Sequence, residues 1–135
     1  MDLQRLMNRS SQASRFPADA CERSAERCSD VEPFGDARLS TERVAQIARG
    51  LAHPARVAIV EQLSDGRPRR AGDIVRESGL APSTVSEHLR VLREADILAS
   101  RRDGPRVCYC LRQPVLARFA AALAALVDEP LSVGT

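Results

Sequence analysis

The chain has 135 residues, a length that suits one domain and is too short for two. Its hydrophobic fraction of 44% can build a core, but with 3% aromatic residues and no tryptophan that core must be aliphatic. No stretch of about 18 apolar residues occurs, which argues against a membrane-spanning helix. Two histidines and no glycine-rich phosphate loop leave no nucleophile and base to propose, so we expect no enzyme.

The net charge of +2 is unevenly distributed along the chain. Residues 1–40 hold six arginines against seven acids, residues 41–112 hold thirteen against nine, and residues 113–135 hold one against two. The positive excess therefore lies in the middle segment, which favours a polyanionic partner such as nucleic acid. Four cysteines without an apolar export signal predict a protein of a reducing cytoplasm, where thiols act as ligands or sensors.

The first forty residues show no sustained hydrophobic period, and we predict that they form a mobile arm. Short helices are expected over residues 2–9 and 18–29. The second of these contains Cys21 and Cys28. In an unbroken helix the two thiols would share a face but lie about 10 Å apart along the axis, too far to bind one ion together.

Two helices are predicted after the arm. The first begins at a cap formed by Ser40 or Thr41 and has apolar residues at helical spacing, namely Val44, Ile47, Ala48 and Leu51. His53 and Pro54 mark the boundary with the second helix, so His53 is interpreted as a boundary residue. The second helix is predicted to turn Val57, Val60 and Leu63 inward, and a turn over residues 64–68 ends it.

A helix-turn-helix follows, formed by residues 71–78, a turn containing Gly79, and residues 81–96. The second helix has one apolar stripe, formed by Val85, Leu89, Leu92 and Ala95. Its other face is polar and consists of Ser83, Thr84, Ser86, Glu87 and Arg90. In such motifs the second helix enters the major groove, so we predict that this face contacts DNA rather than being an ordinary solvated face.

Two side chains of the second helix have separate interpretations. Glu87 can accept a hydrogen bond from cytosine N4, although its charge repels phosphate. His88 lies beside the apolar stripe and is predicted to be buried and hydrogen-bonded.

A β-hairpin is predicted over residues 97–111, because Asp103 and Gly104 stand between two strand-like runs. In the second run, alternation places Val107, Tyr109 and Leu111 on one face and Arg106, Cys108 and Cys110 on the other. Three arginines surround the tip of this hairpin, as expected of a wing that contacts phosphates: Arg101, Arg102 and Arg106.

The last predicted helix, residues 114–127, is apolar nearly all round, and Arg118 is its only charge. A small monomer cannot leave such a helix in water, so we expect a second copy of the chain to cover it. The residues expected at that interface are Leu116, Phe119, Leu123 and Leu126. A twofold dimer also places two recognition helices about 34 Å apart, which matches successive major grooves of a palindromic site.

Three stretches together resemble the ArsR/SmtB family of bacterial winged-helix repressors: residues 51–56, 83–95 and 103–111. The resemblance covers residues 41–127. It implies a mostly α-helical winged helix-turn-helix domain with a small β-hairpin, preceded by the arm 1–40 and followed by a tail, 128–135. It further implies a bacterial, cytoplasmic homodimer paired through its first and last helices, with Val44 at the interface, that binds double-stranded operator DNA and not a membrane.

The family's two best-known sensor sites are absent from this sequence. A Cys-x-Cys of the arsenic type would fall at Arg70 and Gly72, and the last helix lacks the histidine that a zinc site requires. What remains is Cys108 and Cys110, whose Cα atoms on a strand lie about 7 Å apart with both thiols on one side, suitable for gripping one soft ion. Cys21 or Cys28 can supply a third thiolate from the arm.

Thiolates favour cadmium, lead, copper(I) or zinc. The resemblance adds As(III) and Sb(III), which we favour as the inducers that release the operator. Three alternatives stay open. The cysteines can be small fillers, they can form a redox or reactive-sulfur switch through a disulfide from the arm to the wing, or the chain can be a dimeric interaction module without DNA binding.

Overall fold

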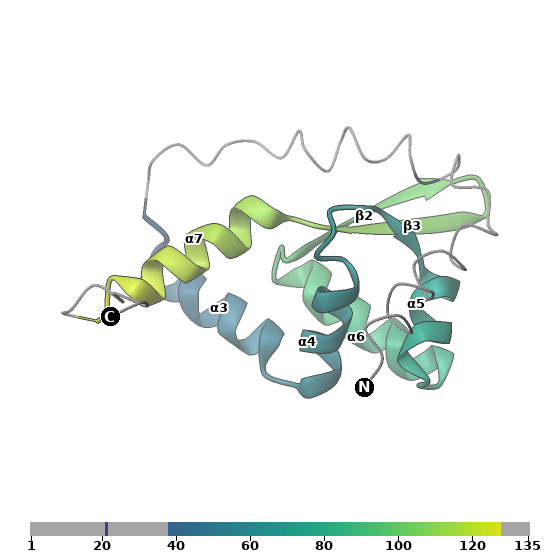
Figure 1. Cartoon of the computed structure of the whole chain (residues 1–135), viewed down its shortest axis with the longest axis horizontal. Helices are drawn as coiled ribbons and strands as arrows, with labels where there is room; N and C mark the ends of the chain where they lie inside the picture. The colour runs from purple at the N-terminus through teal and green to yellow at the C-terminus, as the bar shows by residue number, and fades with distance from the viewer. Residues whose placement is uncertain (1–20, 22–37, 128–135) are drawn as a thin grey trace, which may run out of the picture.

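The computed structural model describes Cys21 and residues 38–127, leaving out the side chain of Asp103. The elements along the chain are α3 (Thr41–Leu51), α4 (Pro54–Gln62), β1 (Arg69–Arg70), α5 (Ala71–Ser78), α6 (Pro82–Glu94), β2 (Leu98–Asp103), β3 (Arg106–Leu111) and α7 (Gln113–Ala124) (Figure 1). These bounds confirm the predicted fold class. The short helices predicted in the arm and the predicted tail lie outside the described residues.

Helices α3 and α7 lie together at one end of the molecule, and the β2–β3 hairpin extends from the other (Figure 1). Helices α4, α5 and α6 pack between them, and α6 contacts α3, α4 and α5. Helix α6 is therefore joined by packing to every other helix of the segment 41–96.

Local capping explains where the helices begin and end. The Ser40 side chain accepts a hydrogen bond from the Arg43 amide at 3.2 Å and caps α3. His53 caps α4 in the same way, since its Nδ1 accepts from the Ala55 amide at 3.0 Å, which confirms it as a boundary residue. Gly79 ends α5 with a φ of 70°, a left-handed conformation that glycine adopts without strain.

The core is aliphatic, as the composition predicted. Its members come from all five described helices and the hairpin: Ile47, Ile59, Leu63, Ile74, Val85, Leu89, Leu92, Ala95, Ile97, Leu98, Leu111 and Val115. The predicted stripe of α6 is confirmed, because all four of its residues are buried.

Two residues of the predicted apolar patterns are not buried. Val57 in α4 is 41% exposed, and Ile59 occupies the core instead. Ile59 and Leu63 are four residues apart and share one face of α4, whereas Val57 projects from nearly the opposite side. Ala48 of α3 is likewise exposed.

The sheet has three antiparallel strands in the order β1-β3-β2. The hairpin is confirmed, with Gly104 at its tip in a left-handed conformation (φ 62°). The sequence did not predict β1, whose two arginines pair with Tyr109 and Cys108. Leu98 opposes Leu111 and both join the core, so Cys108 and Cys110 lie on the face that points away from it.

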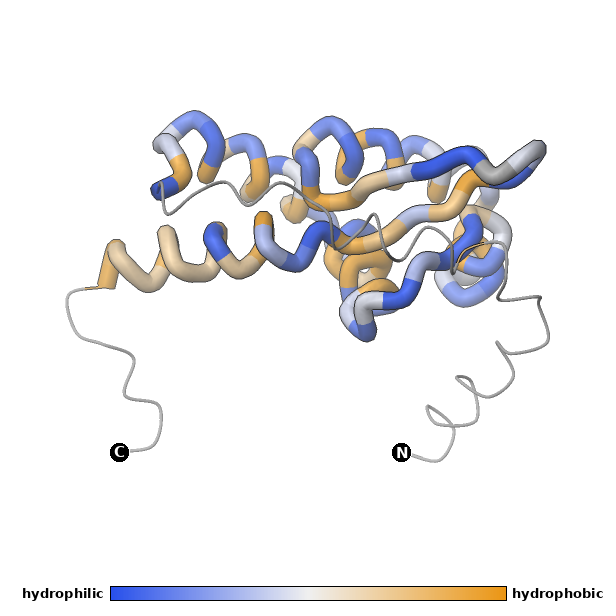
Figure 2. The backbone as a smooth tube through the Cα atoms, turned by 90° about the horizontal axis from the view of Figure 1, so that it is seen from above, coloured by the Kyte–Doolittle hydropathy of each residue, from blue (hydrophilic) through white to orange (hydrophobic). Residues whose placement is uncertain are grey.

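Helix α7 is coloured apolar along most of its length (Figure 2). Val115 is buried, and Leu116 and Phe119 pack against the core. Toward the C-terminal end Leu123, Leu126 and Val127 are exposed, Leu126 by 77%. Among the described helices, none is long and apolar enough to cross a bilayer.

Candidate nucleic-acid interface and thiol site

Helix α6 presents its polar face to solvent, as a recognition helix must. The exposed side chains are those predicted for DNA contact: Ser83, Thr84, Ser86, Glu87 and Arg90. Helix α5 and a short turn at Gly79 hold α6 from behind, and Pro82 occupies its first turn, where a missing amide hydrogen costs nothing. The structure therefore brings these five residues onto one accessible surface, and their contact with bases or phosphates stays a prediction.

Arg90 is held on this surface by two carboxylates. Its guanidinium donates from both Nη2 and Nε to the Glu87 carboxylate, the Nε contact being 3.1 Å long, and from Nη1 to Glu94 Oε1 at 2.7 Å. Glu94 was not among the predicted site residues, although its i, i+4 spacing from Arg90 is typical of such pairs. The hydrogen bond from Arg90 lowers the pKa of Glu87, and the two carboxylates raise the pKa of Arg90.

This triplet determines the net charge of the exposed polar face of α6. Two carboxylates and one guanidinium give Glu87, Arg90 and Glu94 a combined charge of −1 at neutral pH. The triplet as a whole therefore does not attract a polyanion, and it presents both hydrogen-bond donors and acceptors on the exposed face of α6.

The wing carries three arginines, but they do not share one face. In the strand register Arg101 opposes Cys108, whereas Arg102 opposes Val107 on the other side of the sheet. Arg102 and Arg106 are exposed and Arg101 is half-buried. Arg102 and Arg106 thus offer charge to a phosphate backbone from opposite faces of the hairpin tip.

His88 is buried at 8% exposure, as predicted, but its Nδ1 has no hydrogen-bond partner, which corrects the hydrogen-bonded interpretation. Its ring lies against that of His53, with centroids 4.6 Å apart and planes inclined by 45°. Burial lowers the pKa of His88, and the nearby His53 and Arg56 lower it further. The contact was not predicted because 35 residues separate the two rings.

A second contact that the sequence did not predict joins α3, the end of α6 and the link between β3 and α7. Asp96, just after α6 and with a φ of 59°, accepts a hydrogen bond from Arg43 of α3 at 3.0 Å, and its other oxygen lies 3.2 Å from Arg112. Arg112 directly follows β3 and precedes α7. One carboxylate therefore connects the expected dimer helices to the recognition helix and to the cysteine-bearing strand.

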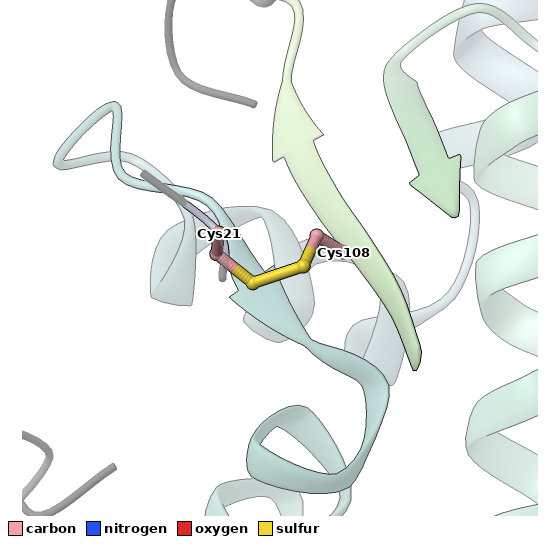
Figure 3. Close-up of a disulfide and its surroundings, with 2 residues drawn as sticks. All are labelled: Cys21 and Cys108. Carbon is pink, nitrogen blue, oxygen red and sulfur yellow. A yellow bond between two sulfur atoms is a disulfide. The ribbon is translucent and has the colours of Figure 1, made fainter. Parts of the chain in front are cut away.

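The arm and the wing meet at a disulfide. Cys21 and Cys108 are 87 residues apart in sequence, and their sulfur atoms are bonded with Cα atoms 5.8 Å apart (Figure 3). Both residues are buried, although Cys108 lies on the sheet face that points away from the core. The sequence had offered Cys21 and Cys28 equally as arm partners for the wing.

Cys110 is also disulfide-bonded, so no thiolate stands on the wing in this state. The described residues contain no group of three or more histidine, cysteine, aspartate or glutamate side chains arranged to hold a metal ion. Binding of a soft ion at Cys108 and Cys110 therefore requires the reduced chain. Cys28, the remaining predicted ligand, lies outside the described residues.

An exposed polar helix backed by a helix-turn-helix, with an arginine-bearing hairpin beside it, defines a winged helix-turn-helix transcriptional regulator. The family model described as "Bacterial regulatory protein, arsR family" matches residues 53–100. The "Uncharacterized HTH-type transcriptional regulator Rv0081" of Mycobacterium tuberculosis is 37% identical over 89 residues, which span 65% of this chain and 77% of that protein. The chain belongs to the arsR family of bacterial regulatory proteins.

Two further comparisons agree with that assignment. The "Biofilm growth-associated repressor" of Agrobacterium fabrum is 34% identical over 64% of this chain and 74% of its own length. The solution structure of the homodimeric winged helix-turn-helix DNA-binding domain of Mb0332 from Mycobacterium bovis, described as a possible ArsR-family regulator, superposes with a TM-score of 0.53. It is 27% identical and covers 63% of this chain and 79% of that one.

Proposed function

We propose that this protein is a homodimeric repressor of the bacterial cytoplasm that binds a palindromic operator through α6 and the wing. It releases the operator when its arm–wing cysteines change chemical state. The exposed face of α6 and the arginines of the wing support DNA binding. A relative named as a repressor and a homodimeric structural neighbour support the mode of action.

The dimer is proposed to form through α3 and α7. These helices contact each other, and Leu116 and Phe119 of α7 pack against the core. Leu123 near the end of α7 and Leu126 in the turn that follows it are exposed. Val44 of α3 is half-buried, and we propose that it belongs to the same interface. Burying this apolar end against a second copy removes it from water and pairs the recognition helices for successive major grooves.

The signal is proposed to be a thiophilic metal or metalloid, with As(III) and Sb(III) favoured over cadmium, lead and zinc. The observation that carries this proposal is the meeting of Cys21 with Cys108, because an arm thiol reaches the wing thiols. In the reduced chain Cys108 and Cys110 on one face of β3, with Cys21 or Cys28, would supply three soft ligands. Such an ion would draw the arm onto the strand that joins β1 to the wing.

A coupling free energy of about 1–3 kcal/mol between this site and the operator would change DNA affinity 5- to 150-fold. The disulfide itself favours a second candidate, in which oxidation or reactive sulfur replaces the ion as the signal. Both candidates keep the same fold, dimer and operator.

The two signals are separated by a titration of the fully reduced chain bound to an operator selected from random duplexes. Arsenite, antimonite, cadmium and lead are added to one series under anaerobic conditions with a reductant, and hydrogen peroxide to another without it. Release in the first series, abolished by Cys108→Ser combined with Cys110→Ser, supports the metal signal. Retention of DNA at a stoichiometric excess of every ion rejects it, and failure to select any operator rejects the repressor.

A further inference from the structure

We propose that Cys108 is a peroxide-reactive thiol and that Cys21 is the thiol that resolves it, so the arm acts as a reversible redox clasp on the wing sheet. Its effect on operator binding rests on the proposed function above. The chemistry itself belongs to the chain and is measured without DNA.

The strand register gives Cys108 a position that no other described cysteine has. It stands on the middle strand between Arg70 of β1 and Arg101 of β2, each directly opposite it. Residues opposed in this way project from the same face, with Cβ atoms about 4.5–5.5 Å apart. An arginine on each neighbouring strand places positive charge on the face of Cys108, and positive charge favours the thiolate form of a cysteine, which is the form that attacks an oxidant.

Cys110 offers the contrast on the same strand and the same face. Its partner on β2 is Ala99, and the two-residue strand β1 ends its pairing at Cys108. The strand register therefore places no arginine opposite Cys110. The structure thus distinguishes the two wing cysteines by charge, although the sequence presents them as an equivalent pair.

The burial of Cys108 is consistent with a thiol that Cys21 covers only while the disulfide is formed. Cys108 is 2% exposed even though it faces away from the core, and Cys21 lies bonded on that same face. Breaking the bond frees Cys21 to move aside. That displacement opens Cys108 to a small oxidant.

The reaction balances with a peroxide as the two-electron oxidant. The Cys108 thiolate attacks one oxygen, the O–O bond breaks, and with one proton taken up the products are a sulfenic acid on Cys108 and one molecule of water. The Cys21 thiol then attacks the Cys108 sulfur, the S–O bond breaks, and the second oxygen leaves as water. Two thiols are oxidised to one disulfide and one peroxide is reduced to two molecules of water.

The position of Cys108 also connects the clasp to the DNA-binding elements. Strand β3 is hydrogen-bonded on one side to β1, whose Arg70 is the N-cap residue of α5, and on the other side to the wing strand β2. A covalent tether at Cys108 therefore acts on the strand shared by the helix-turn-helix and the wing. We expect the clasped form to bind the operator more weakly than the reduced form.

The test uses the full reduced chain with hydrogen peroxide, monitored by peptide mass spectrometry and by trapping with dimedone, a reagent for sulfenic acids. Wild type is expected to form the Cys21–Cys108 disulfide, and Cys21→Ser to accumulate dimedone adduct at Cys108. Cys110→Ser is expected to keep the disulfide, which shows that Cys110 is not required. Arg101→Gln is expected to slow the reaction of Cys108 several-fold, and the matched control Arg102→Gln, opposite Val107, to leave it unchanged.

Two results would overturn the clasp. One is dimedone capture at Cys21 rather than at Cys108 in the corresponding single variants, which would reverse the roles. The other is equal oxidation rates in Arg101→Gln and Arg102→Gln. Circular dichroism of each variant checks that it is folded, and operator binding of the oxidised and reduced chains is measured separately. A chain that forms the clasp but binds no operator refutes the proposed function and leaves the thiol chemistry intact.

Discussion

The rings of His53 and His88 lie against each other with centroids 4.6 Å apart, joining the cap of α4 to the buried side of the recognition helix. His53 uses its Nδ1 to accept from the Ala55 amide, whereas the Nδ1 of His88 is buried without a partner. The positive charge of Arg56 lowers the pKa of His88, and the negative charge of Glu87 acts in the opposite direction. The contact therefore favours an uncharged His88.

This contact predicts a loss of stability in acid. Burial, His53 and Arg56 lower the pKa of His88 below its ordinary value of 6.5, so the unfolded chain binds the proton more tightly than the folded chain. The free energy of unfolding should be unaffected by His88 above that ordinary value. It should fall as the pH decreases below 6.5, until the folded pKa is passed.

Urea unfolding at a series of pH values from about 8 to about 5 measures the effect. His88→Gln, which cannot titrate, should flatten the dependence, while carboxylates elsewhere contribute equally to both proteins. A slope that is the same in His88→Gln and wild type would contradict the assignment of the effect to His88.

Periodicity and turn chemistry predicted most of the fold. The stripe of Val85, Leu89 and Leu92 recurs at a spacing that only a helix buries on one side, and Asp103-Gly104 is a strong hairpin signal. Strand β1 was missed because two residues show no alternation. Val57 was misassigned because α4 is apolar on several sides, so the pattern could not fix which side faces the core.

Contacts between residues far apart in the sequence were the part of the candidate site that the sequence did not predict. The exposed face of α6 follows from helical geometry and was predictable residue by residue. The meeting of Cys21 with Cys108 across 87 residues was predictable only as one of several arm–wing combinations. The difference between Cys108 and Cys110 depends on the register with Arg70, and a single sequence does not contain that register.

Gly50 is predicted to be required for the packing of α3 on the start of the wing. A Cβ at this position would lie 2.8 Å from Ile97 Cδ1 and 2.9 Å from Ala95 Cβ, closer than carbon atoms approach. Gly50→Ala should therefore lower the free energy of unfolding by about 1–3 kcal/mol, the cost of overpacking a core. Urea unfolding gives the value.

Gly72→Ala is the matched control, because its Cβ would meet no atom within 4 Å and its φ is not left-handed. Alanine there should raise stability by about 0.5 kcal/mol, since glycine is a poor helix former. Equal effects of the two substitutions would show that the close approach at Gly50 is relieved by a shift of α3.

The exposed end of α7 and the turn that follows it are predicted to hold the dimer together. Leu126→Glu places a charge where the proposed interface excludes water, so the variant should be monomeric at micromolar concentration by light scattering after gel filtration. Val57→Glu changes a similarly apolar, exposed residue on α4 and should remain dimeric. A monomeric wild type would refute the proposed dimer, and a dimeric Leu126→Glu variant would place the interface elsewhere.

Arg90 of the Glu87–Arg90–Glu94 triplet is predicted to contribute to operator binding, and the salt dependence of its substitution shows whether it contacts a base or a phosphate. Arg90→Gln should weaken operator binding by about 1–3 kcal/mol if the guanidinium reads a guanine, with little change in the salt dependence. If Arg90 contacts a phosphate instead, binding should weaken on all sequences and the salt slope should fall by about 1. Fluorescence anisotropy at several salt concentrations distinguishes the two results.

Glu87 and Glu94 provide an internal comparison, since each pairs with the same arginine but they lie two turns apart along α6. Glu87 lies nearer the N-terminal end, where recognition helices touch base edges, and Glu94 is the last residue of the helix. Glu87→Gln should therefore change the preferred base at one operator position. It should also strengthen binding to unrelated DNA, because it removes a negative charge from the exposed polar face of α6. Glu94→Gln should leave the base preference unaltered, and a common change in both variants would mean that the carboxylates act only by holding Arg90.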